Sequence, residues 1–124
     1  MIAIIFAFGI LVGALGGILM KVGASHLGGS IQLNSFNDII HILLKVFTDV
    51  TILGGMSLYF LSALVWLYLL TKLDISYVQP ILSLTYVVTP ILAIIFLGES
   101  VPFLRWLGIS IIIIGVFIVA RTSA

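Results

Sequence analysis

Polar side chains recur at helical spacing in one of the most apolar stretches of the chain. Between positions 75 and 97 they are Ser76, Gln79, Ser83 and Tyr86, in steps of three and four residues. Steps of that length place side chains on one face of an α-helix. We expect a polar stripe along this helix, able to donate and accept hydrogen bonds without carrying a charge.

A second polar stripe lies in the preceding apolar stretch, where Tyr59, Ser62 and Trp66 have the same spacing. Two stripes that face each other would line a groove for a polar or amphipathic solute. Alternatively, these side chains serve only as interhelical hydrogen bonds that hold the bundle together.

Two prolines, Pro80 and Pro90, lie in the same stretch as the first stripe. Each removes a backbone hydrogen bond and frees the carbonyl four residues earlier, here those of Ser76 and Tyr86. We therefore predict that the helix breaks at the two prolines. In lipid, freed carbonyls need a neighbour or a wet cavity. Kinked helices that line a cavity at mid-membrane are typical of transporters, so the prolines favour transport.

Three basic residues, Lys21, Lys45 and Arg105, are expected on one side of the membrane. Arginine binds phosphate bidentately and lysine binds it as a point charge. We predict that Lys21 and Arg105 bind a phosphate or a lipid headgroup and that Glu99 organises them. The alternative is that the basic residues mark the ends of the spans and pair with lipid phosphates, Glu99 or Asp38.

Catalysis and metal binding have no support in the sequence. Cysteine is absent, and the chain contains no H-E-x-x-H, G-x-S-x-G or P-loop motif. No ionisable side chain falls in the middle of an expected span, where a proton-coupled pump normally needs one. The net charge of +1 does not provide the concentrated basic patch that nucleic-acid binding needs. We expect no enzyme activity, no metal, no cofactor and no nucleic-acid partner.

The elements that position these residues follow from composition. The chain is 63% hydrophobic and 7% charged, too little charge to cover a water-soluble surface. Four stretches are long and apolar enough to cross a bilayer: residues 2–20, 50–71, 75–97 and 101–120. We predict one all-α integral membrane domain over residues 1–124, a bundle of four transmembrane helices with both termini on the same side. The basic residues are too evenly divided to orient it, so single and dual topology both remain open.

A shorter amphipathic helix is expected before the second span, over residues 36–49. Its apolar residues recur at period 3.6 opposite a charged face. It is too short and too charged to cross the membrane, so we predict that it lies in the membrane interface. An early extension of the second span is the alternative for its C-terminal end.

Glycines mark two helix faces. Gly9, Gly13, Gly16 and Gly17 give the first span a smooth face for close helix approach. Gly108 and Gly115 lie two turns apart on the last span, where they form either an ordinary contact within the chain or a dimer seam. Four helices are scarcely enough to enclose a path, so we favour a dimer, in which antiparallel copies would form an inverted repeat.

The run from position 75 onward resembles the C-terminal half of an EamA-type repeat in the drug/metabolite transporter superfamily. The likeness is carried by P-I-L-S-L-x-Y at Pro80–Tyr86, L-G-E at Leu97–Glu99, R-W-L-G at Arg105–Gly108 and the final I-x-x-G-V. With L-M-K at Leu19–Lys21 it extends into the first span. The resemblance implies a membrane transporter.

Two groups of proteins that consist of a single four-helix repeat resemble this chain. The small multidrug resistance exporters are antiparallel homodimers with a working glutamate in the first helix; Ala14 stands there in this chain, and their aromatic positions fall on Gln79 and Leu82. The glycine pair of their last helix is kept as Gly108 and Gly115. The scaffold therefore matches and the proton-coupled drug site does not.

The second group comprises the short flippase subunits for aminoarabinose-phosphoundecaprenol, which work as heterodimers. They are similar in Ser83–Leu84, Glu99 and Arg105–Trp106. This likeness implies a flippase for a polyprenyl-phosphate-linked sugar, in a prokaryotic cell membrane, working as a homodimer or with a paralogue. The alternatives are an exporter of small metabolites or cations and a non-transporting membrane scaffold.

Overall fold

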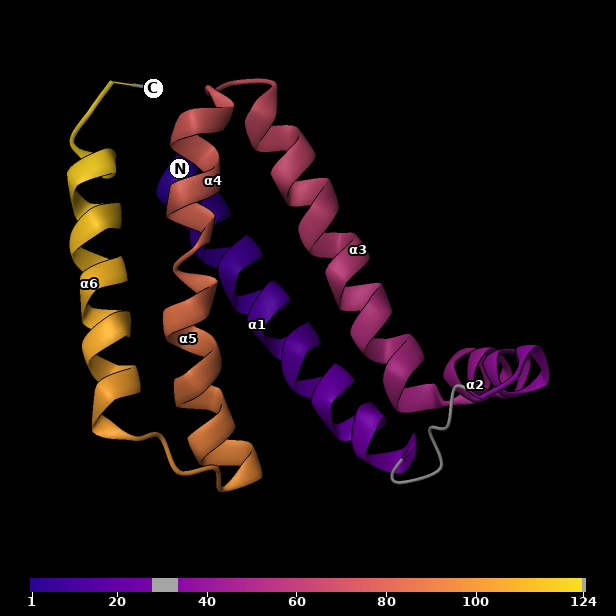
Figure 1. Ribbon diagram of the computed structural model, residues 1–124. Helices are drawn as coiled ribbons and strands as arrows, with labels where there is room; N and C mark the ends of the chain where they lie inside the picture. Colours follow the sequence, from indigo (N-terminus) through magenta and orange to yellow (C-terminus); the bar gives the residue numbers. More distant parts are fainter. Residues whose placement is uncertain (28–33, 124) are drawn as a thin grey trace.

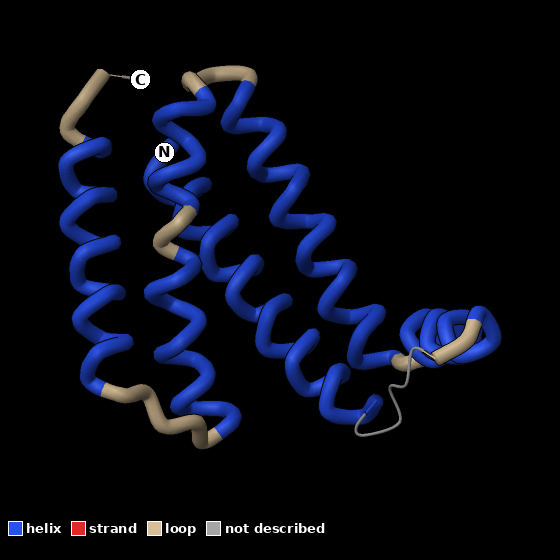
Figure 2. The backbone as a smooth tube through the Cα atoms, in the orientation of Figure 1, coloured by secondary structure: helices blue, strands red, loops and turns tan. Residues whose placement is uncertain are grey.

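The computed structural model describes residues 1–27 and 34–123. Its helices are α1 (Ile2–Leu27), α2 (Phe36–Thr48), α3 (Val50–Leu70), α4 (Ile75–Leu82), α5 (Thr85–Leu92), a π-helical turn (Ala93–Leu97) and α6 (Phe103–Ala120). No strand occurs in these two ranges (Figure 2). Four helical stretches are long and apolar enough to span a membrane, with α4, α5 and the π-turn together forming the third. The prediction of an all-α protein with four spans is confirmed.

The spans run up and down, and both termini lie at the same end of the bundle (Figure 1). The first helix is longer than its predicted span of 2–20, because it continues through Lys21 to Leu27. Lysine ends an apolar run but is a good helix former, so it does not end the helix. The fourth helix begins at Phe103, two residues after the predicted start.

Helices α1 and α3 cross closely because glycines meet at the crossing. A methyl group built on Gly16 would lie 3.1 Å from the Gly55 carbonyl oxygen, and one on Gly9 would lie 2.9 Å from Val65 Cγ1. The hydroxyl of Ser62 donates to the Gly9 carbonyl at 3.1 Å and ties the helices together. The glycine face of the first span is therefore a packing face within the chain, as expected for small-residue seams in membranes.

The third span is broken, but not at either proline. Pro80 lies inside α4 and Pro90 inside α5, and the break falls at Ser83 and Leu84. There the Ser83 N–H is shared between the Gln79 and Pro80 carbonyls, and the Leu84 N–H reaches the Ile81 carbonyl at 3.1 Å. Bonds that reach back only three residues tighten the turn and end the helix. The predicted breaks at Pro80 and Pro90 are thus corrected to one break between α4 and α5.

The buried core lies where α1, α3, α4 and α6 meet. Its cluster consists of Phe6, Leu69, Val78, Ile81 and Val116. Helix α6 packs along α4 and α5 at the edge of the bundle (Figure 1). A methyl group built on Gly108 or Gly115 would have no atom of another helix within 4 Å among the described residues. Ordinary packing within the chain therefore does not explain these glycines, and the dimer seam stays a prediction.

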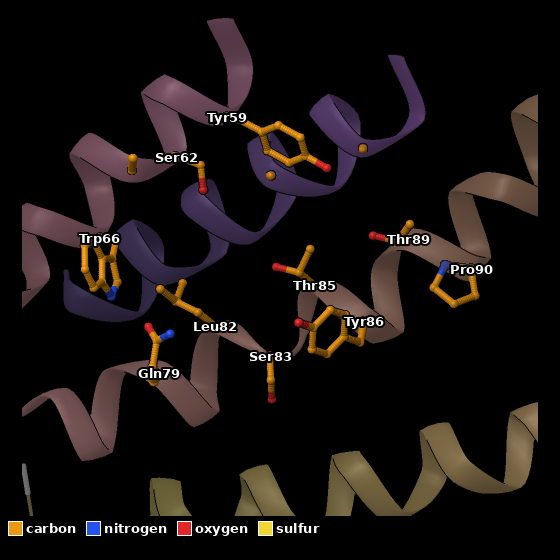
Figure 3. Close-up of a pocket in the computed structure, with 13 residues that line it drawn as sticks. Tyr59, Ser62, Trp66, Gln79, Leu82, Ser83, Thr85, Tyr86, Thr89 and Pro90 are labelled. Atoms are coloured by element: carbon orange, nitrogen blue, oxygen red, sulfur yellow. The ribbon is translucent and has the colours of Figure 1, made fainter. Parts of the chain in front are cut away.

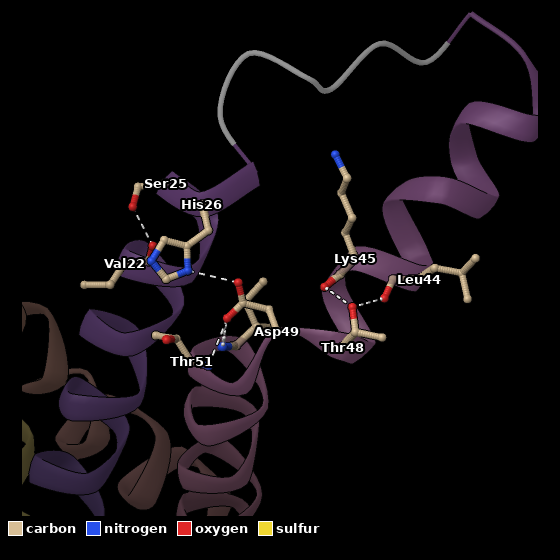
Figure 4. A network of polar contacts seen from close by, with 9 residues as sticks. Val22, Ser25, His26, Leu44, Lys45, Thr48, Asp49 and Thr51 are labelled. Atoms are coloured by element: carbon tan, nitrogen blue, oxygen red, sulfur yellow. Dashed lines mark hydrogen bonds and ion pairs between the residues drawn. The ribbon is translucent and has the colours of Figure 1, made fainter.

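One aspartate fixes the corner between α2 and α3 (Figure 4). Asp49 accepts hydrogen bonds from the N–H groups of Thr51 and Ile52, which caps α3, and its own N–H donates to the Lys45 carbonyl at the end of α2. His26 Nδ1 lies 2.9 Å from Asp49 Oδ2, so the end of α1 is joined to the same corner. The hydrogen bond with His26 lowers the pKa of Asp49.

Helix α2 is separate from α3 and is seen almost end-on beside it in Figure 1. All six residues of its apolar stripe are exposed; they are Phe36, Ile39, Ile40, Leu43, Leu44 and Phe47. No residue of the helix is buried. The predicted helix therefore exists with its apolar face uncovered by the rest of the described chain.

Candidate substrate groove

A cavity of about 860 Å³ lies between α3, the α4–α5 segment and the glycine face of α1 (Figure 3). The structure brings six of the seven predicted groove residues to its wall; they are Tyr59, Ser62, Trp66, Gln79, Ser83 and Tyr86. The two stripes therefore face each other. That they bind a substrate remains a prediction.

Ser76 is the predicted groove residue that does not line this cavity. It lies in the first turn of α4, where it is exposed, far along the helix from the break. Gln79, Ser83 and Tyr86 share the wall across the break, so only the first residue of the predicted stripe lies outside it. The stripe was extended one turn too far.

Sequence reasoning missed two threonines of the groove. Thr85 and Thr89, four residues apart at the start of α5, both line the cavity (Figure 3). Their spacing was a readable signal, but they lie off the face on which an unbroken helix would put Gln79 and Ser83. Gly13 and Gly17 of α1 also line the cavity, and the lack of side chains there leaves room beside Ser62 and Tyr59.

Most polar side chains of the groove have no partner in the described part of the chain. Ser62 donates to the Gly9 carbonyl and Ser83 to the Pro80 carbonyl. No side-chain hydrogen bond occurs there for Tyr59, Gln79, Thr85, Tyr86 or Thr89. The interhelical-glue interpretation therefore accounts for Ser62 and leaves the others available to a solute.

No charged side chain lines the groove in the part of the chain that the structure describes. Its lining contains hydroxyls, one amide, one indole and apolar groups. An isolated charge buried in a low-dielectric site is costly unless an opposite charge pairs with it. The arrangement therefore suits an uncharged polar group that exchanges hydrogen bonds with hydroxyls and an amide.

The predicted phosphate-binding residues are not gathered around this groove. Lys21, Arg105 and Glu99 are all exposed, on α1, on α6 and in the loop before α6. Figure 1 shows the end of α1 and the start of α6 at the same end of the bundle, with α5 between them. In residues 1–27 and 34–123, Glu99 forms no ion pair with either basic residue. Its organising role thus has no contact to support it within one chain.

The sequence of this four-span protein matches that of a known protein family. A profile of the EamA-like transporter family matches residues 1–121. The chain belongs to the EamA-like transporter family. The EamA resemblance drawn from the sequence is confirmed, and so is a multi-pass membrane protein.

Two relatives of this EamA-like chain carry a functional name. It is 37% identical over 60 residues to the "Probable 4-amino-4-deoxy-L-arabinose-phosphoundecaprenol flippase subunit ArnE" of Yersinia pseudotuberculosis serotype O:1b, covering 48% of this chain and 53% of that protein. It is 36% identical over 63 residues to the protein of the same name from Pseudomonas savastanoi pv. phaseolicola, covering 51% and 55%. The chain thus spans about half the length of the curated relatives it matches. No solved structure matches it.

Proposed function

We propose that this EamA-like protein moves a polyprenyl-phosphate-linked sugar, or a similar amphipathic lipid-linked solute, from one membrane leaflet to the other. The observation that carries the proposal is the uncharged groove of about 860 Å³, lined by polar side chains that lack partners in the described chain. The names of the relatives agree with this substrate class. Transport of a small polar metabolite or a cation is the competing function.

The groove suits an amphipathic solute because polar side chains from two walls reach into a lining that is otherwise apolar. Tyr59 and Tyr86, on its two walls, are 45% and 65% exposed, so the groove is not closed over. A sugar could occupy the groove while a polyprenyl chain stays in the surrounding lipid. The sugar then crosses the apolar core against hydroxyls and an amide instead of hydrocarbon.

A dimer completes the proposal. Gly108 and Gly115 leave a face of α6 on which a second helix can approach closely, and two copies supply eight spans. A second copy of this chain would also bring further copies of Lys21, Arg105 and Glu99 for the phosphate. Helix α2 would lie in the membrane interface with its uncovered apolar stripe in the acyl region.

Native mass spectrometry of the protein released gently from its own membrane tests this function. The expected result is a dimer that retains a polyprenyl-phosphate species in preference to bulk phospholipid. A dimer with bulk phospholipid alone would favour the small-solute exporter. A lone monomer would remove the second half on which the transport path depends.

A further inference from the structure

Trp66 contains a polar atom that the fold leaves unsatisfied. Its ring lines the groove from α3, and its indole Nε1 is buried with no hydrogen-bond partner among the described residues. A buried donor without a partner costs about 1–3 kcal/mol. Buried tryptophan N–H groups usually find a partner, so this one needs an explanation.

Packing alone does not supply one. A phenylalanine would offer an aromatic ring to the same wall and would carry no unpaired donor. The buried indole N–H therefore lowers the stability of the ligand-free fold, and no hydrogen bond among the described residues compensates for it. The donor gains a favourable role when a ligand brings an acceptor to it.

A second side chain that can form hydrogen bonds, that of Gln79, lies on the opposite wall of the groove. Figure 3 shows its side-chain amide directed from α4 toward the indole of Trp66. Gln79 is exposed and makes no side-chain hydrogen bond within residues 1–27 and 34–123. Its amide offers an acceptor and a donor on a flexible stem. The end of the groove at Trp66 and Gln79 thus presents one fixed donor and one adaptable donor–acceptor.

We propose that Trp66 Nε1 and the Gln79 amide form a hydrogen-bonding subsite for a hydroxyl of an uncharged sugar. The hydroxyl oxygen accepts from the indole N–H and its proton is donated to the amide oxygen, so donors and acceptors balance. The N–H is covered by neighbouring side chains, and binding includes a rotation of the flexible Gln79 arm. This subsite rests on the proposed function and names the part of the substrate that the groove recognises.

The proposed subsite recognises the sugar of the lipid-linked substrate and not its phosphate. The indole and amide N–H groups could donate to a phosphate oxygen, but no cation lines the described groove to pair with a phosphate, so burying that charge beside Trp66 is costly. A lipid phosphate without a sugar therefore gains nothing from Trp66. Removal of the indole N–H should weaken only the sugar-bearing lipid.

The test compares two probes: farnesyl phosphate carrying glucose, and bare farnesyl phosphate. Binding to the full chain in micelles is measured by calorimetry for the wild type, Trp66→Phe, Gln79→Met and the control Trp106→Phe, whose ring lies on α6 outside the groove. Loss of one neutral hydrogen bond corresponds to a roughly 2- to 10-fold weaker affinity. We expect that loss for the glucose probe with Trp66→Phe and Gln79→Met, and no change for the bare probe.

A spectroscopic readout needs no groove variant. The chain has two tryptophans, so nitrogen-15 indole labelling gives two N–H resonances that Trp106→Phe assigns. The glucose probe should shift the Trp66 resonance and leave that of Trp106 in place, and the bare probe should shift neither.

The outcomes separate the two proposals. If the wild type binds the glucose probe but Trp66→Phe leaves that affinity unchanged, or weakens both probes equally, the subsite is wrong and the proposed function stands. If the wild type binds neither probe, the proposed function itself fails, and the subsite fails with it.

Discussion

The crossing of α1 and α3 makes a sharp prediction at two adjacent glycines. A methyl group on Gly55 would lie 3.0 Å from the Gly16 carbonyl oxygen and 3.1 Å from the Met20 backbone nitrogen, closer than the 3.4 Å where ordinary contact begins. Both atoms are backbone, so relief requires the helices to separate. Outside its own helix, a methyl group on Gly54 would meet only the Leu19 side chain among the described residues, at 3.6 Å. Gly54→Ala is therefore a matched control for Gly55→Ala.

Both substitutions gain the higher helix propensity of alanine, but only Gly55→Ala also introduces a close contact. Alanine in place of glycine favours a helix by about 1 kcal/mol at either position. Overpacking at Gly55 costs about 1–3 kcal/mol. We expect Gly54→Ala to raise the free energy of unfolding, and Gly55→Ala to fall below Gly54→Ala by about 1–3 kcal/mol.

Unfolding in mixed micelles with increasing SDS, followed by tryptophan fluorescence, measures this difference, since the free energy is extrapolated linearly. Trp66 lies on α3 itself and reports its environment. Equal stability of the two variants would refute the close crossing, and with it the placement of Ser62 and Trp66 beside α1.

Three further predictions follow from the groove, from α6 and from the corner at Asp49. The double substitution Thr85→Val and Thr89→Val keeps the side-chain volume and removes two hydroxyls that have no partner in the described chain. The free energy of unfolding should change by less than about 0.5 kcal/mol. The rate at which vesicles transport a glucose-bearing lipid should fall several-fold. Gly115→Leu should convert the proposed dimer to a monomer in native mass spectrometry without lowering the unfolding midpoint, because no other helix of the described chain comes within 4 Å of a methyl group built there. Because the hydrogen bond with His26 lowers the pKa of Asp49 below 3.8, this carboxylate stabilises the fold above that pH and loses its contribution as the pH falls through the lowered pKa. Asp49→Asn should therefore flatten the dependence of the unfolding midpoint on acid pH, and an unaltered dependence would contradict the corner.

The spans could be predicted from sequence because length and apolar composition determine them. Their ends were less certain, since the apolar run stops at Lys21 but the backbone hydrogen bonds continue to Leu27. That the two polar stripes face each other stayed an open alternative, because helical spacing gives the face that each stripe occupies but not the rotation of one helix relative to the other.

The break in the third span could not be placed from proline alone. Proline removes a donor at its own position, but the helix ended where Ser83 and Leu84 adopted bonds to residues three earlier, which depends on the packing around α4 and α5. The break brings Thr85 and Thr89, which follow it, to the wall of the groove, whereas Ser76 precedes it in the first turn of α4 and lies outside the cavity. The unpartnered indole of Trp66 likewise depends on its three-dimensional surroundings, which a sequence does not display.

The most direct test of the account is transport in sealed vesicles that contain the purified chain and glucose-bearing farnesyl phosphate in both leaflets. Membrane-impermeant periodate cleaves the sugar diols that reach the outer leaflet. We expect cleavage to proceed past the outer pool to near completion with the wild type, and more slowly with Trp66→Phe. Cleavage that stops at the outer pool, as in vesicles without protein, would contradict the claim that the groove carries a lipid-linked sugar across the membrane.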